Sequence, residues 1–239
     1  MSKNLVRVDR VTKKYSKIVA VNEVSLSVAA GEVYALVGAN GAGKSTLIRI
    51  LAGITSADEG KVFIDGEDIA RRSPRIKKRI GYLPEELFLY NRLSGHEYLQ
   101  LVAGIKDADP ESVSAQIEFF ELSDVAEKWI GGYSLGMRKK LGLASAMIGA
   151  PDVLILDEPL NGLDVEMMRK LRERIETERA ENHAVLISSH VMSFVERISD
   201  RVGIMCGGKL VAEGSTGDLR QSAGLADAPF EDVFFKLAR

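Results

Sequence analysis

The sequence predicts an α/β fold, built from a mainly parallel sheet, an N-terminal antiparallel β subdomain and an inserted helical subdomain. Three solid apolar blocks, residues 33–37, 153–156 and 184–187, are typical of central parallel strands covered on both faces, and a helical pattern follows each block. Residues 5–11 and 24–28 alternate between apolar and polar side chains with period 2. This alternation predicts two half-buried antiparallel strands near the N-terminus.

The middle third of the chain has the pattern of helices and no strand block of its own. Ser94 and Glu97 have the spacing of a capping box, and Asp109 stands as an N-cap before Pro110 at a first helical position. We therefore expect a helical subdomain inserted between two strands, and an ordinary helical crossover is the alternative. The expected organisation is one domain over residues 1–239, with the β subdomain and α/β core at 1–84 and 150–239 and the helical subdomain at 85–149.

Composition excludes several classes of protein. Lys and Arg number 32 against 34 Asp and Glu, a formal net charge of -2, which argues against a polybasic nucleic-acid binder and against an acidic disordered chain. Cys206 is the one cysteine, so neither an intrachain disulfide nor a cysteine-based zinc site is expected. The longest unbroken apolar run is residues 33–37, whereas a membrane-spanning helix needs about 20 residues. We expect a cytoplasmic protein.

Residues 38–45 match the phosphate-binding pattern G-x-x-x-x-G-K-[ST]. The match follows the strand block at 33–37 and opens a helical run at 46–52, which is the context that a P-loop requires. Its glycines allow backbone N–H groups to turn toward phosphate oxygens, and the helix N-terminus adds a positive dipole end. Lys44 is expected to reach the β- and γ-phosphates, and the Ser45 hydroxyl to bind Mg²⁺. The expected ATP-binding residues of this loop are Gly38, Asn40, Gly41, Ala42, Gly43, Lys44, Ser45 and Thr46.

The apolar block at 153–156 ends in two carboxylates, Asp157 and Glu158. In P-loop enzymes a carboxylate at the end of a neighbouring strand holds Mg²⁺, and Asp157 fits that role. Glu158 is placed to orient or deprotonate an attacking water. Simple capping of the next helix is the alternative for both residues.

Taken together, these motifs resemble the ATP-binding cassette (ABC) ATPases over essentially the whole chain. The run YSLGMR at 133–138 resembles the family's signature motif, whose commonest form is LSGGQ, and retains its serine and its last glycine. Residues 160–164 resemble the D-loop, and residues 81–84 resemble the strand that leads into the Q-loop. The YSLGM form, the Leu-Pro-Glu form of the Q-loop and the ending at 231–234 resemble bacterial exporter cassettes whose membrane domain is a separate polypeptide.

The resemblance implies further site residues. Ser134 and Gly136 would contact the γ-phosphate of an ATP held by a second cassette, although a serine before a helix is more commonly a simple N-cap. His190 would hydrogen-bond the γ-phosphate and assist catalysis together with Glu158 and Lys44. Tyr15 would stack on adenine, although a tyrosine in a strand more often packs on its neighbours.

Glu85 departs from the family pattern, because the Q-loop normally supplies a glutamine at this position. A carboxylate can face the metal, but it cannot donate an amide N–H, and it adds negative charge beside the γ-phosphate. We expect Glu85 either to face Mg²⁺ or to link the nucleotide state to the helical subdomain.

The implied function is an ATP-hydrolysing subunit that powers export by an integral membrane permease subunit. The expected assembly is a homodimer or pseudo-dimer of cassettes, bound through the permease to the inner face of the cell membrane, with no nucleic-acid partner. Three alternatives remain open: a soluble ABC ATPase that acts on DNA or ribosomes, a non-hydrolysing scaffold, and an importer cassette.

Two other segments have a functional and a structural interpretation each. The basic run at 71–79 fits nucleic-acid or anionic-lipid contact, but a solvated surface segment is the simpler interpretation. The apolar cluster at 87–90 fits either packing inside the helical subdomain or a groove for a cytoplasmic helix of the membrane partner.

Overall fold

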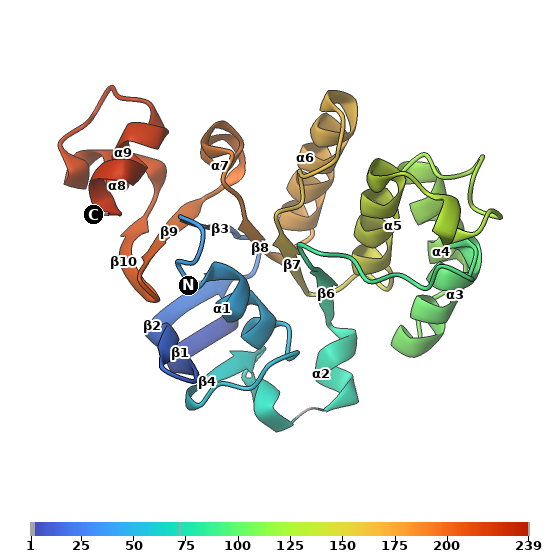
Figure 1. Cartoon of the computed structure of the whole chain (residues 1–239), viewed down its shortest axis with the longest axis horizontal. Helices are drawn as coiled ribbons and strands as arrows, with labels where there is room; N and C mark the ends of the chain where they lie inside the picture. Colours follow the sequence, from blue (N-terminus) through green and yellow to red (C-terminus); the bar gives the residue numbers. More distant parts are fainter. Residues whose placement is uncertain (1–2, 72, 239) are drawn as a thin grey trace.

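The computed structural model describes residues 3–71 and 73–238, which form two sheets flanked by helices (Figure 1). The strands of the larger sheet are β3 (Val33–Gly38), β6 (Ile80–Leu83), β7 (Val153–Asp157), β8 (Ala184–Ser188), β9 (Arg201–Cys206) and β10 (Lys209–Gly214). Their order is β10-β9-β3-β8-β7-β6, and only β10 is antiparallel to its neighbour within the described residues. The predicted α/β class with a mainly parallel sheet is confirmed.

The smaller sheet is antiparallel and contains both predicted N-terminal strands. Its strands are β1 (Asn4–Tyr15), β2 (Ile18–Ala29), β4 (Glu59–Ile64) and β5 (Glu67–Asp68), in the order β2-β1-β4-β5. β1 and β2 extend well beyond the predicted segments, and their pairing register shifts several times. Arg10 and Glu23 have φ angles of 45° and 51°. Such bulges interrupt the period-2 alternation on which the prediction depended without ending the strands.

The helices lie at both ends and along the larger sheet. In Figure 1, α3, α4 and α5 gather in one lobe, while α8 and α9 lie at the opposite end beside the C-terminus. The helical segments are α1 (Lys44–Leu51), η1 (Ile69–Arg71), α2 (Pro74–Lys78), α3 (Gly95–Lys106), α4 (Glu111–Phe119), η2 (Ile130–Gly132), α5 (Leu135–Met147), α6 (Val165–Ala180), α7 (Met192–Ile198), α8 (Thr216–Ala223) and α9 (Phe230–Leu237).

Each face of β7 belongs to a different apolar core. Val153 and Ile155 pack with residues of α1 and of the smaller sheet, whereas Leu154 and Leu156 pack with residues of α5 and α6. All four side chains are fully buried. A strand that is covered on both faces needs apolar side chains at successive positions, which explains the unbroken block in the sequence.

Between β6 and β7 the chain leaves the sheet and forms α3, α4, η2 and α5. The capping box at the start of α3 is confirmed: Ser94 Oγ accepts from the Glu97 backbone N–H, and the Glu97 carboxylate accepts from the Ser94 N–H. At the start of α4, Asp109 Oδ1 accepts from the Glu111 N–H at 2.9 Å. β6 and β7 are adjacent parallel strands, so this helical segment leaves the sheet at the carboxyl end of β6 and returns to it at the amino end of β7, at the opposite edge.

The basic run at 71–79 contains α2 and the start of the path into β6, and its position 72 lies outside the described residues. Lys78 pairs with Asp107 at the end of α3, and Arg79 pairs with Asp152 just before β7. The last two cations of the run therefore tie α2 to neighbouring segments of the fold.

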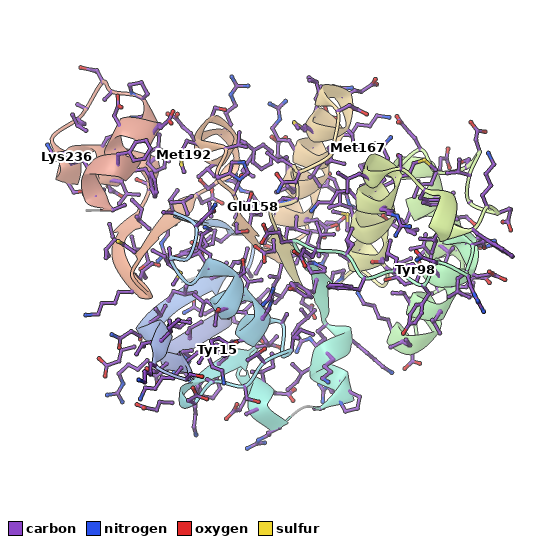
Figure 2. The ribbon with its side chains drawn as sticks, viewed as in Figure 1. Tyr15, Tyr98, Glu158, Met167, Met192 and Lys236 are labelled. Carbon is purple, nitrogen blue, oxygen red and sulfur yellow. The ribbon has the colours of Figure 1, made fainter. Side chains whose placement is uncertain are left out.

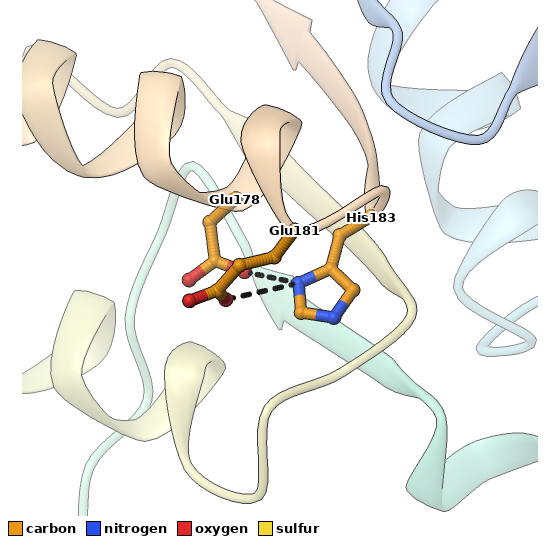
Figure 3. Close-up of side chains that lie close together, drawn as sticks. All are labelled: Glu178, Glu181 and His183. Atoms are coloured by element: carbon orange, nitrogen blue, oxygen red, sulfur yellow. Dashed lines mark hydrogen bonds and ion pairs between the residues drawn. The ribbon is translucent and has the colours of Figure 1, made fainter.

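Another polar cluster connects the end of α6 to the start of β8 (Figure 3). Glu178 is 1% exposed, and its carboxylate accepts from Arg174 at 2.8 Å and from His183 Nδ1 at 2.7 Å. Glu181 lies 3.8 Å from the same His183 nitrogen but is largely exposed. Although these three potential metal ligands lie close together, Arg174 and His183 already satisfy Glu178. We assign the cluster as a structural clamp.

No helix within residues 3–71 and 73–238 combines the length and the apolar character that a bilayer span requires.

Candidate active site

The predicted phosphate loop connects β3 to α1 with the backbone conformation that its glycines allow. Gly41 and Gly43 have φ angles of 79° and 103°, in the left-handed region that side chains rarely adopt. A Cβ atom at Gly43 would also collide with the carbonyl oxygen of Ala20. The following helix begins at Lys44, two residues before the predicted start, because the Gly43 carbonyl already accepts from the Leu47 N–H at 3.0 Å. The free N–H groups of the first helical turn therefore lie at the loop itself.

The Lys44 side chain folds back across this loop. Its ammonium donates to the carbonyl oxygens of Gly38 at 2.7 Å and Ala39 at 3.3 Å. The side chain is nearly buried, at 8% exposure. The loop thus holds a positive charge among its own backbone groups.

A cavity of about 600 Å³ opens over the loop. Beyond the loop, its lining comes from β2, from the segments after β6 and β7, and from the turn between β9 and β10. The described lining residues are Ile18, Val19, Ala20, Asn40, Gly41, Ala42, Gly43, Lys44, Ser45, Thr46, Glu85, Glu158, Gly207 and Gly208. Of the predicted loop residues, Gly38 lies at the end of β3 and outside this lining.

Tyr15, the predicted adenine-stacking residue, is not part of the lining among the described residues. Its ring is 45% exposed at the end of β1 in the smaller sheet, with the Lys13 ammonium 5.5 Å from the ring centroid (Figure 2). Ile18 and Val19, on the other side of the same hairpin turn, are exposed apolar residues that do line the cavity.

Asp157, the last residue of β7, and Glu158, which follows it, are both hydrogen-bonded to one hydroxyl group. Asp157 lies opposite Ser188 in the pairing of β7 with β8. Ser188 Oγ donates to Asp157 Oδ1 at 2.5 Å and accepts from the Glu158 backbone N–H at 2.9 Å. Ser188 is completely buried, so both of these hydrogen bonds are made by a group inside the protein.

Burial raises the pKa of Asp157, and the negative charges of Glu85 and Glu158 act in the same direction. Hydrogen bonds from Ser188 and Ser45 oppose this increase but do not cancel it. Asp157 is therefore a carboxylate whose charged form is unfavourable until a cation approaches.

Glu158 lies near the centre of the molecule in Figure 2, with a φ angle of 47° and a buried side chain. Its Oε2 lies 2.9 Å from His190 Nδ1, and the His190 side chain is 63% exposed. The predicted pair of Glu158 and His190 is thus brought into direct hydrogen-bond contact. The imidazole reaches outward from a carboxylate that the strand end holds fixed.

Ser134 and Gly136 lie at the start of α5 and do not line the cavity among the described residues. Ser134 Oγ accepts from the Met137 N–H at 3.2 Å, so the serine is an N-cap. It is also exposed, and Leu135 beside it is 74% exposed. Gly136 lies against the backbone of Gly162, in the predicted D-loop. This helix end is an open surface of the single chain.

The sequence profile described as ABC transporter matches residues 21–161. The chain belongs to the ABC transporter family.

Characterised relatives agree with this assignment. The lantibiotic transport ATP-binding protein SrtF of Streptococcus pyogenes is 35% identical over 209 residues, covering 87% of this chain and 90% of the relative. The ABC transporter ATP-binding protein NatA of Bacillus subtilis is 34% identical and covers 89% of both chains. The bacitracin transport ATP-binding protein BcrA of Bacillus licheniformis is 36% identical, covering 87% of this chain and 69% of the relative.

A solved ATP binding subunit of an ABC transporter superposes on this ABC ATPase with a TM-score of 0.93 at 28% identity, covering 98% of this chain and all of the other. A dimeric cassette bound to ADP and Pi shares the fold with a TM-score of 0.82 at 21% identity, covering 88% of this chain and 98% of the other. The chain is therefore an ATP-binding ABC ATPase and a transporter subunit.

The donor atoms of this ABC ATPase fit a magnesium ion. Ser45 and Asp157 are hydrogen-bonded to each other beside the phosphate loop, and Glu85 lines the same cavity. Mg²⁺ prefers oxygen ligands, and proteins usually hold it through one or two carboxylates together with phosphate oxygens. The hydroxyl and carboxylate oxygens present are of that type.

Some residues of the site were not assigned from the sequence. Ser188 stands in the run that precedes His190, but its role depends on the strand pairing that sets it opposite Asp157. Ile18 and Val19 are unusual in the sequence only as apolar residues immediately after a hairpin turn, where polar residues are common. Neither this feature nor a serine close to His190 identifies a site residue unless the fold is known.

Proposed function

We propose that this ABC ATPase binds and hydrolyses ATP in the cavity over the phosphate loop and thereby powers export by a separate membrane permease subunit. The observation that carries the proposal is the hydrogen-bonded set of Asp157, Ser188, Glu158 and His190 beside that cavity. Relatives named for lantibiotic transport, bacitracin transport and daunorubicin resistance support export over a non-transport ABC ATPase.

In the proposed ATP complex, the backbone N–H groups of the loop and the first turn of α1 bind the phosphate oxygens. Lys44 exchanges its hydrogen bonds with Gly38 and Ala39 for the β- and γ-phosphates. Ile18 and Val19, which line the cavity, provide an apolar surface for adenine, and Tyr15, on the other side of the same hairpin turn, extends that surface.

Ser45 and Asp157 would hold the Mg²⁺ that accompanies ATP, with Glu85 facing the same ion. When bound, that ion neutralises charge on the phosphate oxygens. Glu158 orients the attacking water and accepts its proton, and His190 fixes the Glu158 carboxylate and reaches toward the γ-phosphate. Attack on the γ-phosphorus breaks its bond to the β-γ bridging oxygen, and ADP and inorganic phosphate leave.

A second copy of the cassette completes each site in this proposal. The exposed N-terminus of α5, with Ser134 and Gly136, carries a hydroxyl and free N–H groups that suit an anion. Because this end does not line the cavity of its own chain, the γ-phosphate that it binds belongs to the partner copy. The two copies are identical or closely similar and bind two ATP molecules head to tail.

The membrane permease is proposed to dock beside the helical segment, which brings the cassette to the inner face of the membrane. An apolar groove of about 530 Å³ is lined by Ile54, Tyr82, Val102 and Ile105, among other residues of α2, β6, α3 and α5. In the apolar cluster at 87–90, Leu87 and Leu89 pack against the core of the helical segment, whereas Phe88 and Tyr90 are exposed. The first pair fits internal packing, and the second pair is available to a membrane partner.

The proposed site is tested with Glu158→Gln, which keeps the shape of the side chain but removes the base. We expect ATP binding to remain, steady-state phosphate release to fall by about 100-fold or more, and an ATP-dependent dimer to accumulate in size-exclusion chromatography. Glu173→Gln, the same change at an exposed position of α6, is the control and should hydrolyse ATP like the parent. Full turnover by Glu158→Gln would refute the role of Glu158.

A further inference from the structure

Lys139 is a buried cation for which the site described so far has no use. It lies in the second turn of α5 and is 3% exposed. None of the described residues offers its Nζ a hydrogen-bond acceptor. The cations on either side of it are paired: Arg138 donates to Asn91, and Lys140 donates to Glu121. An unpaired buried ammonium is costly, so its retention calls for a compensating charge.

The face of α5 that carries Lys139 lies against the segment that carries Glu85. Gly142, one helical turn after Lys139, is so close to Leu83 and Leu87 that a Cβ atom there would collide with both side chains. Residues three apart share one helix face, so Lys139 faces the same segment. Glu85 lies between Leu83 and Leu87, at the carboxyl end of β6.

The negative charges that act on Lys139 come from the ATP site. Burial lowers the pKa of Lys139, and the charges of Asp157, Glu158 and Glu85 oppose that lowering. Asp157 is the last residue of β7 and Glu158 follows it, and β7 pairs with β6. A single ammonium from the helical segment therefore experiences the negative charge of all three carboxylates.

Glu85 creates an electrostatic problem for ATP. It lines the cavity together with Lys44 and Ser45, so its carboxylate lies where the γ-phosphate is to be bound. Glu85 is exposed in the single chain, but two negative charges held beside each other still repel. A counter-charge of fixed position removes this penalty without occupying the cavity, since Lys139 does not line it among the described residues.

We propose that Lys139 is a positioning residue of the ATP site, whose ammonium offsets the Glu85 carboxylate so that the γ-phosphate can be bound beside it. The inference rests on the proposed function, because it assumes that ATP occupies this cavity. It assigns to α5 a second role, in addition to presenting Ser134 and Gly136 to the partner copy.

The test is a double-mutant cycle on the full chain, with Lys139→Gln, Glu85→Gln and both changes together. Affinities for a non-hydrolysable ATP analogue and for ADP are measured by calorimetry in the presence of Mg²⁺. Lys139→Gln should lower the preference for the ATP analogue over ADP by about tenfold, equivalent to about 1.4 kcal/mol. Adding Glu85→Gln should return the preference to within about threefold of the parent. Lys140→Gln, the neighbouring control, should leave it unchanged.

Equal weakening of both nucleotides by Lys139→Gln, or strictly additive effects of the two changes, would overturn the inference, since a purely structural lysine has no reason to distinguish the γ-phosphate. If Lys139→Gln does not fold, Glu85→Gln decides alone, measured without Mg²⁺ so that the loss of a Mg²⁺-facing carboxylate plays no part. It should raise the preference for the ATP analogue, and a lowered preference would contradict the proposal. Failure of the parent chain to bind either nucleotide would refute the proposed function instead.

Discussion

Ser188 determines the positions of the two acidic groups of the site. Its hydroxyl has one proton, which it donates to Asp157, and it accepts from the Glu158 N–H with a lone pair. The direction of both hydrogen bonds is therefore fixed while Asp157 is ionised. Glu158 in turn orients His190 through a contact of 2.9 Å. The geometry of the base thus depends on a completely buried serine that does not line the cavity among the described residues.

Asp157→Asn should stabilise the nucleotide-free protein. Burial raises the pKa of Asp157, so the folded state binds this proton more tightly than the unfolded state does, and ionisation at neutral pH reduces stability. At pH 7 we expect the thermal midpoint to rise by roughly 2–4 °C, or by about 1 kcal/mol. The gain should disappear as the pH falls to values at which Asp157 of the parent is protonated. Calorimetry of both proteins between pH 4 and pH 8 measures the effect, with exposed Asp124→Asn as the control.

The same substitution should remove the stabilisation that ATP gives in the presence of Mg²⁺. If the thermal midpoint of Asp157→Asn at pH 7 without nucleotide is lower than that of the parent, ionised Asp157 does not destabilise the folded protein, and the prediction is wrong.

Individual site residues were predictable where the chemistry is local in the sequence. Lys44 and Ser45 follow from the spacing of the phosphate loop, and Asp157 and Glu158 from their place after an apolar strand block. Ser188 was not predictable in its role, because a hydroxyl acquires that role only when β8 pairs with β7 in one register.

At the scale of elements, the joint between α6 and β8 fixes the strand that carries Ser188 and leads to His190. Glu178, at the end of α6, accepts from Arg174 one turn earlier and from His183 just before β8. The clamp sets where β8 begins, and the strand ends at Ser188, five residues after His183. A buried carboxylate with two donors makes this joint rigid, whereas a turn of exposed residues would not.

Glu178→Ala should therefore destabilise the protein by about 3 kcal/mol, because it leaves Arg174 and His183 without their shared acceptor. Glu181→Ala removes an exposed carboxylate from the same cluster and should change stability by less than about 0.5 kcal/mol. Urea unfolding of both variants measures the difference. Equal effects of the two substitutions would show that the clamp does not hold the joint.

The elements themselves were largely predictable from hydrophobic periodicity. The solid blocks became β3, β7 and β8, because each is covered on both faces. The lengths of β1 and β2 were underestimated, since bulges near Arg10 and Glu23 shift the alternation out of phase. The start of α1 was misplaced by two residues. The sequence does not reveal that Gly43 is the last residue of the loop in the left-handed region and that helical backbone begins directly after it.

At the scale of the whole molecule, the two parts of the predicted ATP site lie on different surfaces. Lys44 lines the cavity over the phosphate loop, whereas Ser134, the N-cap of α5, is exposed and does not line it among the described residues. The sequence alone gives both motifs but not their separation, which is a property of the folded chain. A head-to-tail pair of copies would bring each surface against the complementary one, as the isologous contact of a two-fold dimer requires.

This arrangement predicts complementation between two inactive variants. Lys44→Ala removes the phosphate-binding cation, and Ser134→Asp keeps an N-cap residue while placing a negative charge against the partner's γ-phosphate. Each variant alone should be inactive, because both sites of its dimer carry the defect. In an equal mixture, half of the dimers are mixed, and each has one site with an intact loop and an intact signature end. Phosphate release should therefore recover to about a quarter of the parent rate if pairing is random and the two sites act independently. A mixture as inactive as its components would contradict the two-copy site. It would indicate that each chain uses its own Ser134, although Ser134 does not line the cavity of its own chain among the described residues.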